Sequence, residues 1–176
     1  MFTEVEIPEG VEARKENSYL IIKGEKGELK RQFKKPGINF EIKDKKVVFE
    51  SKDNRKGKRL INTFAAHARN MIRGVTKGYE YKLKVIHTHF PITVKKQDDW
   101  VLIENIFGEK NPRKARIMPD TEVIIQGDEI IVRGIDIEKT GQTAANIENA
   151  AKRSGFDRRV FQDGIYITEK AKEWTK

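Results

Sequence analysis

The sequence contains no cysteine. Structural disulfides, thiolate zinc sites and cysteine nucleophiles are therefore excluded, and a reducing setting fits the chain. No apolar run approaches the ~20 residues that a membrane-spanning helix needs. Glu4, Glu6 and Glu9 stand near the N-terminus, where a signal peptide would carry basic and then apolar segments. We expect a soluble, cytoplasmic protein with no membrane partner.

Residue patterns that would indicate an enzyme are also scarce. Gly57-Lys58 lacks the upstream glycine of a phosphate-binding loop, because Lys52 stands at the required position. His87 and His89 would share one face of a strand, as two metal ligands might, but no third ligand accompanies them at a suitable spacing. A metal at these two histidines is the one route to catalysis that the sequence leaves open. We otherwise expect no enzyme, no cofactor, no metal and no small-molecule substrate.

Charge, in contrast, is abundant and unbalanced. Lys and Arg number 36 and Asp and Glu 27 in 176 residues, which gives a net charge of +9 and a pI near 9.6. This excess of basic residues favours polyanionic partners. A heat-adapted surface is the alternative, and it would explain the high proportion of charged residues better than the excess of positive ones. The first 80 residues hold 19 basic and 12 acidic side chains, against 17 and 15 in the rest. Charge alone would therefore place phosphate binding in the N-terminal half.

The chain also repeats itself at an offset near 83 residues, with apolar positions aligned on apolar positions. The order is retained over most of each half, so we predict an α+β fold of two tandem homologous domains. Each domain is expected to be a small, mostly antiparallel sheet packed against one helix, with the first at residues 1–81 and the second at 82–176. The aligned pairs are Pro8 with Pro91, Val11 with Val94, Phe40 with Val123, Ile42 with Ile125, Val47 with Ile130, Phe49 with Val132 and Asp53 with Asp136, and with one inserted residue Gly24-Glu25-Lys26 meets Gly108-Glu109-Lys110.

The first half predicts two hairpins and a helix. Apolar runs and turn residues place the hairpins at 19–33 and 38–49. Apolar residues then recur at three- and four-residue intervals from Leu60 to Ile72, which is typical of an amphipathic helix. Gly74 stands where a helix-terminating glycine is expected.

The second half follows the same order. Asp136 or Thr140 is expected to cap a shorter helix, which Gly155 is expected to end. Between the halves, 83–86 is a candidate strand for joining both modules. The predicted strands of this half cover residues 100–103, 123–125 and 130–132.

Amide and basic side chains are mixed in residues 134–166. They lie on the polar surfaces of the predicted short helix and in a loop at 157–164 that looks exposed. Amides can bond base edges or sugar hydroxyls, and arginines can bind phosphates or stack on bases. This mixture suits RNA, although a solvated helix followed by a C-terminal arm would show the same residues.

Three segments of this region resemble the signature of the ribosomal protein L-six family. They are Gly134-Ile135-Asp136, Thr140 to Glu148 and Arg159 to Tyr166. Met71 to Tyr79 resembles the end of the family's first-domain helix, so the resemblance covers essentially the whole chain. The ending Arg-Val-Phe-Gln-Asp-Gly-Ile-Tyr resembles the archaeal and eukaryotic branch. Ile137 and Thr140 depart from the lysine and the valine that are usual at their positions.

The resemblance implies a structural constituent of the large ribosomal subunit that binds large-subunit ribosomal RNA. It implies a place near the base of the lateral stalk and the sarcin-ricin loop, beside neighbouring ribosomal proteins and in a single copy, where translational GTPases dock. It also implies that the second domain and its C-terminal arm make the principal contacts, against the charge count. The candidate RNA-binding residues are Lys139, Gly141, Gln142, Asn146, Asn149, Lys152, Arg153, Arg158, Arg159 and Gln162.

We expect Gly141 and Gln142 to start the short helix, where backbone N–H groups and a missing side chain would let an RNA backbone approach. Two other functions remain open. One is a free-standing RNA-binding chaperone, translation factor or assembly factor, and the other is a scaffold whose exposed strand edges recruit proteins. Cosedimentation with the large subunit after a high-salt wash would distinguish these alternatives. The sequence also leaves open whether residues 170–176 are ordered in the free protein.

Overall fold

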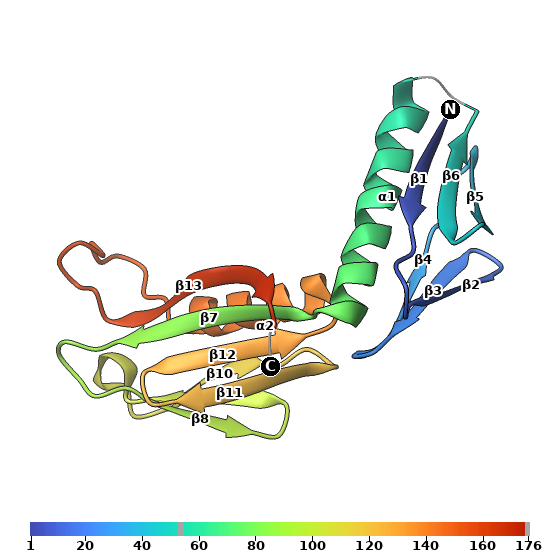
Figure 1. The fold of residues 1–176 in the computed structure, drawn as a ribbon. Helices are drawn as coiled ribbons and strands as arrows, with labels where there is room; N and C mark the ends of the chain where they lie inside the picture. The colour runs from blue at the N-terminus through green and yellow to red at the C-terminus, as the bar shows by residue number, and fades with distance from the viewer. Residues whose placement is uncertain (53–54, 175–176) are drawn as a thin grey trace. The chain divides into compact units, whose positions relative to one another are not determined.

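The computed structural model describes residues 1–52 and 55–174, and the chain divides into two compact units, Met1–Gly78 and Tyr79–Lys176 (Figure 1). The sequence placed this division after Tyr81. It falls earlier because Tyr79 already begins β7 (Tyr79–Ile86), which pairs with strands of the second unit. No helix among the described residues is long and apolar enough to cross a membrane.

The first unit contains two three-stranded antiparallel sheets and one helix, α1 (Arg55–Thr76). The strand orders are β1-β6-β5 and β2-β3-β4, so the single expected sheet is in fact two. Four phenylalanines at the centre, Phe33, Phe40, Phe49 and Phe64, place their ring centroids 5.0–6.1 Å apart. The strands are β1 (Phe2–Glu6), β2 (Glu12–Glu16), β3 (Tyr19–Gly24), β4 (Gly27–Gln32), β5 (Ile38–Lys43) and β6 (Lys46–Ser51).

Helix α1 extends past the glycine that was expected to end it. Gly74 lies inside the helix and is buried, and Val75 after it is fully buried in the core. Gly78 follows the helix with a φ of +70° and donates its N–H to the carbonyls of Arg73 and Gly74. Only glycine adopts this left-handed conformation at low cost, so Gly78 ends the helix and the expectation for Gly74 was wrong.

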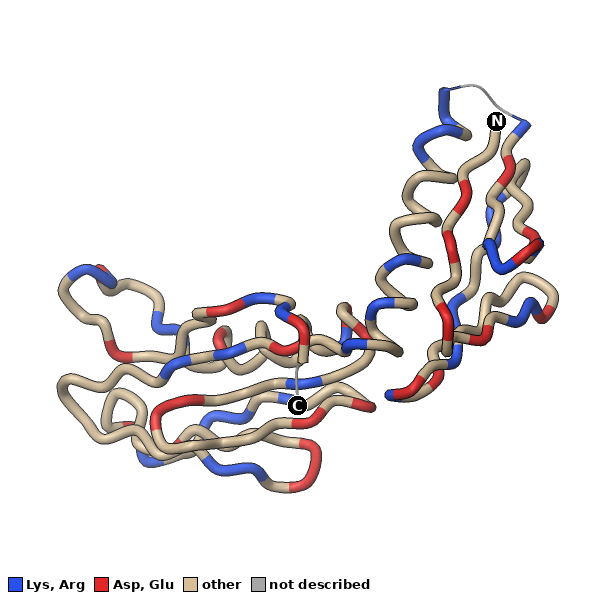
Figure 2. The backbone as a smooth tube through the Cα atoms, viewed as in Figure 1, with Lys and Arg blue, Asp and Glu red and all other residues tan. Residues whose placement is uncertain are grey.

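The same helix carries much of the positive charge of the first unit. Its 22 residues include six basic side chains and no acidic one, and Figure 2 shows these basic residues near its two ends. Such a helix cannot form the i,i+4 ion pairs that usually accompany exposed charges. The charge excess found in the sequence is therefore concentrated on one element.

The second unit contains one helix, α2 (Ile137–Ala150), and two antiparallel sheets of order β11-β12-β7-β13 and β10-β9-β8. Helix α2 packs on a core that includes Leu83, Val101, Ile130 and Ile147, all fully buried. A 3-10 turn, η1 (Ile106–Gly108), lies between β9 and β10. Besides β7, the strands of this unit are β8 (Thr93–Gln97), β9 (Trp100–Glu104), β10 (Arg113–Arg116), β11 (Thr121–Gln126), β12 (Glu129–Gly134) and β13 (Gly164–Glu173).

The two units confirm the duplication. Phe40 pairs with Phe49 across β5 and β6, and their aligned residues Val123 and Val132 pair across β11 and β12. The order β1-β6-β5 corresponds to β7-β12-β11, and β2-β3-β4 corresponds to β8-β9-β10. Asp53, which the offset aligned with Asp136, lies outside the described residues.

The strand β13 has no counterpart among the described residues of the first unit. It joins the edge of β7, so residues 164–173 of the expected C-terminal arm extend the sheet. Register shifts interrupt the pairing after Ile167 and after Glu169, and Ala171 has a φ of +47°. Of residues 170–176, whose order the sequence did not decide, those as far as Glu173 belong to strand β13. Thr175 and Lys176 lie outside the described residues.

Candidate nucleic-acid interface

The start of α2 is built from Gly134, Asp136 and Thr140. The Asp136 carboxylate caps the helix by accepting the N–H of Glu138 at 2.9 Å. The buried Thr140 hydroxyl donates to the carbonyl of Asp136 at 2.7 Å. A Cβ on Gly134 would lie 2.3 Å from that hydroxyl oxygen. Tight packing and helix capping therefore explain why these three residue types occur here, and no contact with RNA is needed to explain them.

Gly141 also has a packing role, and the expectation that it starts the helix was wrong. Helix α2 begins at Ile137, so the N–H of Gly141 lies beyond the helix's free first turn. A Cβ at this position would lie 2.9 Å from the hydroxyl oxygen of Tyr81 on β7. The glycine thus lets the helix approach the sheet.

We expect Gly141→Ala to lower the free energy of unfolding of the second unit by about 1 kcal/mol, because the clash with Tyr81 outweighs the better helix propensity of alanine. Thermal unfolding followed by tryptophan fluorescence measures this, since both tryptophans, Trp100 and Trp174, lie in the second unit. In a Tyr81→Phe background the same change should cost less. An equal loss in both backgrounds would show that Tyr81 is not what Gly141 accommodates.

Two further polar residues of α2 hold the unit together. The Thr143 hydroxyl donates to Lys139 O at 2.9 Å and accepts the N–H of Met118 at 3.0 Å. Asn146 donates its amide to Arg116 O at 2.9 Å, which fastens the helix to β10. Of the candidate residues, Asn146 therefore has at least one structural role.

Other candidates on α2 lie nearer the solvent. Lys139 pairs with Asp120 at 2.9 Å. The exposed Gln142 donates to the amide oxygen of Asn146 at 2.8 Å. At the end of the helix, Lys152 donates to the amide oxygen of Asn149 at 2.6 Å, and both side chains are exposed. The structure thus brings Gln142 together with Asn146, and Asn149 together with Lys152.

Arg113 ends the helix, although the sequence assigned that role to Gly155. Its guanidinium donates to the carbonyls of Ala150 at 3.0 Å and Lys152 at 2.6 Å. Glu109 holds the guanidinium through bonds of 2.7 and 2.8 Å, and these bonds lower the pKa of the Glu109 carboxyl. Gly155, with a φ of +85°, lies in the loop beyond. Arg113, distant in sequence, satisfies the carbonyl of the last helical residue, and the N–H groups of Ala151 and Lys152 donate to Ile147 O and Asn149 O, so no terminal glycine is needed.

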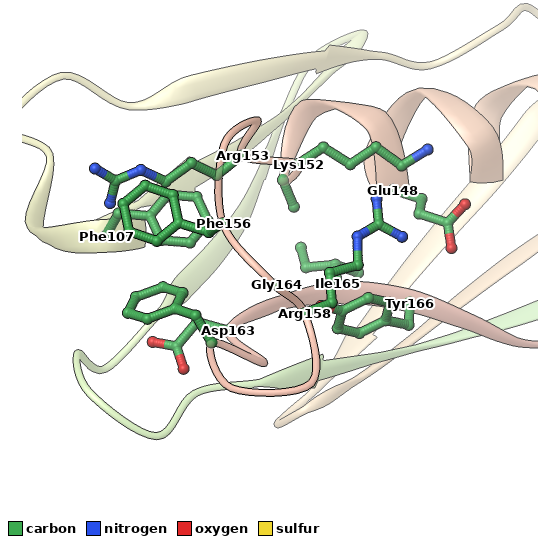
Figure 3. A pocket seen from close by; sticks show the side chains of 12 residues that line it. Phe107, Glu148, Lys152, Arg153, Phe156, Arg158, Asp163, Gly164, Ile165 and Tyr166 are labelled. Atoms are coloured by element: carbon green, nitrogen blue, oxygen red, sulfur yellow. The ribbon is translucent and has the colours of Figure 1, made fainter.

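Arg153 lies over two aromatic rings that the sequence did not single out. Its guanidinium carbon is 4.0 Å from the ring centroid of Phe156 and 5.2 Å from that of Phe107 (Figure 3). The ring of Phe161 lies 5.5 Å from Phe156 and 5.6 Å from Phe107. A guanidinium over aromatic faces is attracted by cation–π interaction, so the rings orient Arg153.

The hollow beside these rings is too small for a nucleobase. Its volume of about 20 Å³ is enough for about one water molecule. Arg158 and Tyr166 contribute to its wall together with Phe156. Any nucleic acid would therefore bind on the outside of this region.

Asp163 anchors the loop between α2 and β13. Its buried carboxylate accepts the N–H and the hydroxyl of Thr88 at 2.9 and 2.5 Å and lies 3.3 Å from the Nδ1 atom of His89. Burial alone would raise the pKa of Asp163, but the hydrogen bonds from Thr88 and His89 outweigh it and lower the pKa to about 2. The loop is therefore tied to the segment that follows β7.

His87 and His89, the two candidate metal ligands, contact residues that do not form a metal site. His87 lies 3.4 Å from Asp128, and the His89 ring stacks on Phe161 at 4.6 Å. Both follow the end of β7 at Ile86, so they do not share a strand face. No group of three potential ligands close enough to hold a metal occurs among the described residues.

The last candidates lie in the loop that precedes β13. Arg159 is 88% exposed and forms hydrogen bonds to Asp157, and these bonds lower the pKa of the Asp157 carboxyl. Gln162 approaches Arg159 O at 3.5 Å, at the limit of a hydrogen bond. The exposed Arg158 has no hydrogen bond or ion pair to any other part of the chain that the structure describes. Its charge is available for a partner.

The candidates thus fall into two groups. Gly141 and Asn146 serve packing, and Lys139 is paired on the surface. The remainder lie on the outer side of α2 and the following loop. We call six of these remaining residues the α2–loop surface, namely Gln142, Asn149, Lys152, Arg153, Arg158 and Arg159, and the seventh, Gln162, lies beside it.

Comparison with known proteins gives a family match over most of the chain. The family described as Ribosomal protein L6 matches residues 7–78 and 90–164, one segment in each unit. These two segments agree with the duplicated architecture.

Individual relatives match over nearly their whole length. The large ribosomal subunit protein uL6 of Ignicoccus hospitalis is 52% identical over 169 residues, which cover 93% of this chain and 91% of the relative. The protein of the same name from Sulfurisphaera tokodaii is 49% identical over 172 residues, covering 97% and 92%. That of Methanocella arvoryzae is 46% identical over 170 residues, covering 96% of each. All three organisms are archaea, which agrees with the archaeal and eukaryotic branch that residues 159–166 resemble.

Proposed function

The chain belongs to the ribosomal protein L6 family and is a non-enzymatic structural constituent of the large ribosomal subunit, and on this premise we propose that it binds large-subunit ribosomal RNA through the α2–loop surface. One observation carries the proposal. Packing accounts for Gly134, Thr140 and Gly141 of the family signature, whereas the exposed Arg158 has no hydrogen bond or ion pair within the described chain. A charge that is exposed and unpaired within the described chain can bind an RNA phosphate without first breaking an internal bond.

The chemistry of the surface suits RNA. Arg158 and Lys152 can neutralise phosphates, and the exposed amides of Gln142 and Asn149 can bond sugar hydroxyls or base edges. Arg153 is already oriented by two rings, so less side-chain freedom is lost when it binds. Asn146 and Gln162 contact this surface through Gln142 and Arg159, and Lys139 lies on the same helix, paired with Asp120.

The family resemblance is the basis for the position that we propose within the subunit. We place the bound RNA near the base of the lateral stalk and the sarcin-ricin loop, where the protein supports the docking of translational GTPases. Neighbouring ribosomal proteins are its other partners. We expect a single copy in each cytoplasmic ribosome.

Replacing Arg158 and Arg159 together by alanine tests the RNA surface. We expect at least a tenfold loss of affinity for a stalk-base RNA fragment near 0.15 M salt, because two phosphate-binding charges disappear. The slope of log affinity against log salt should fall by about 1 for each lost phosphate contact. Fluorescence anisotropy over a salt series measures both quantities.

Lys34→Ala with Lys35→Ala is the matched control, because it also removes two adjacent exposed charges but from the first unit. It should change affinity and slope much less. Equal effects of the two double variants would mean that RNA responds to overall charge, and the assignment to the α2–loop surface would then be wrong.

A further inference from the structure

Strand β1 of the first unit has one paired edge and one free edge. Met1 and Ser51 exchange backbone hydrogen bonds of 3.0 and 2.9 Å, and the N–H of Ile7 donates to Lys45 O at 2.8 Å. The direction of backbone hydrogen bonds alternates along a strand. Odd-numbered residues of β1 therefore bond to β6, and even-numbered residues direct their N–H and C=O groups to the opposite side.

These outward groups belong to Phe2, Glu4 and Glu6. Within the described chain, the backbone N–H and C=O groups of these three residues form no hydrogen bond to any element other than β6. Phe2 is 64% exposed, and Glu4 and Glu6 share a single basic neighbour, Lys46, at 3.1 and 3.9 Å. The free edge is thus acidic within a strongly basic unit, as Figure 2 shows along β1.

The duplicated second unit shows how such an edge is filled. In β7, the N–H of Val85 donates to Asp128 O at 2.7 Å, so odd-numbered residues face β12 and even-numbered residues face the other edge. There β13 is seated, with Tyr166 opposite Lys84 and Glu169 opposite Lys82. The edge that corresponds to the free edge of β1 is occupied by a strand of the same chain.

The charges at equivalent positions are reversed between the two edges. Val5 pairs with Val47 and Leu83 pairs with Ile130, and the duplication aligns Val47 with Ile130. Glu4 therefore corresponds to Lys82, and Glu6 corresponds to Lys84. Lys82 lies 3.7 Å from Glu169 of the added strand. An added strand at β1 would meet carboxylates in place of ammonium groups.

We propose that the free edge of β1 accepts an extended segment of another protein that carries lysine or arginine opposite Glu4 and Glu6. Backbone hydrogen bonds to Phe2, Glu4 and Glu6 would supply the affinity, and the cross-strand ion pairs would select the partner. The inference rests on the proposed ribosomal setting for one point only, that the partner is a neighbouring protein of the subunit with a basic extended tail.

Other occupants and other edges fit less well. The strand β13 of a second copy carries Glu169 at the decisive position, where it would face Glu4. RNA is disfavoured because its phosphates would meet the same carboxylates. The outer edge of β5 in the same sheet is partly covered, since the Lys15 ammonium donates to Phe40 O at 2.7 Å.

Two synthetic peptides test the proposal on the full-length protein. One has the sequence of residues 164–173, and the other has the same sequence with Glu169→Lys. We expect the lysine peptide to perturb the backbone amide NMR signals of Phe2, Glu4 and Glu6 and to bind about fivefold more tightly, as a favourable cross-strand charge pair requires. Glu4→Lys in the protein should reverse this preference.

Glu4→Pro removes one outward N–H without removing a bond to β6, so the unit should fold while peptide binding is lost. Equal binding of the two peptides, absence of binding, or signals that shift at β7 instead would each overturn the proposal. Stalk-base RNA affinity should be unchanged in Glu4→Pro. Failure at the β1 edge and failure of the α2–loop surface can therefore be told apart.

Discussion

Gly134→Ala should lower the free energy of unfolding of the second unit by about 3 kcal/mol, near the upper end of what overpacking usually costs. The new Cβ would lie 2.3 Å from the Thr140 hydroxyl oxygen and 3.4 Å from Asp120 O. Thr140 cannot swing away easily, because it is fully buried and its hydroxyl is bonded to Asp136. Urea unfolding followed by the fluorescence of Trp100 and Trp174 measures the change.

A second variant separates this clash from a general intolerance of alanine. Thr140→Ala removes the hydroxyl that the new Cβ would meet, so Gly134→Ala with Thr140→Ala should lose less than the sum of the two single changes. Strictly additive losses would contradict the explanation. Phe49→Leu is a control, because Phe49 packs in the core of the first unit. This change should leave the unfolding curve followed by Trp100 and Trp174 unaltered.

Asp163→Ala should destabilise the second unit by about 2 kcal/mol, because donors of Thr88 and His89 would lose a buried charged acceptor. The loop that carries Arg158 and Arg159 would also lose its anchor, so we expect weaker binding of stalk-base RNA. Unfolding and RNA titration of the same preparation measure the two effects. Asp157→Ala is the control for the loop, since its carboxylate is partly exposed and bonds to Arg159 within the loop itself.

The same carboxylate gives a pH dependence with a definite sign. The folded-state pKa of Asp163 is about 2, below its usual value of 3.8. The unfolded chain therefore binds more protons between these values, and the stability that Asp163 contributes is present above pH 4 and is lost as the pH falls toward 2. Other carboxyls with lowered pKa add to the acid loss, so the comparison is with Asp163→Asn. The wild type should lose more stability than this variant between pH 5 and pH 3, and parallel curves would refute the assignment.

Much of the fold followed from local pattern. The hairpins at 38–49 and 123–132 were expected from apolar runs and turn residues, and the structure confirms both, with Phe40 opposite Phe49 and Val123 opposite Val132. The short strands β1, β2, β8 and β10 and the long strand β13 were not expected. Strand β13 alternates only briefly before its register shifts, and its partner β7 lies about 80 residues earlier in the chain. Pairing of that kind leaves little local signal.

The candidate site shows the same division. The mixture of amides and arginines in residues 134–166 predicted an RNA-binding surface in the second unit, and this stays a prediction. It could not separate Gly141, which accommodates Tyr81, from Arg158, which has no described partner. It also overlooked Phe107 and Phe156, which orient Arg153. These contacts join segments that are far apart in the chain.

The sequence by itself determined the duplication, the family and the position of the signature, because apolar periodicity and residue identity are properties of neighbouring positions. Only the tertiary structure decided which signature residues face inward, what ends α2, and that β7 is covered by β13 whereas β1 has a free edge. The physical reason is that burial, close approach and strand pairing depend on partners brought together by folding. Arg113 at the end of α2 and Asp163 beside Thr88 are clear instances.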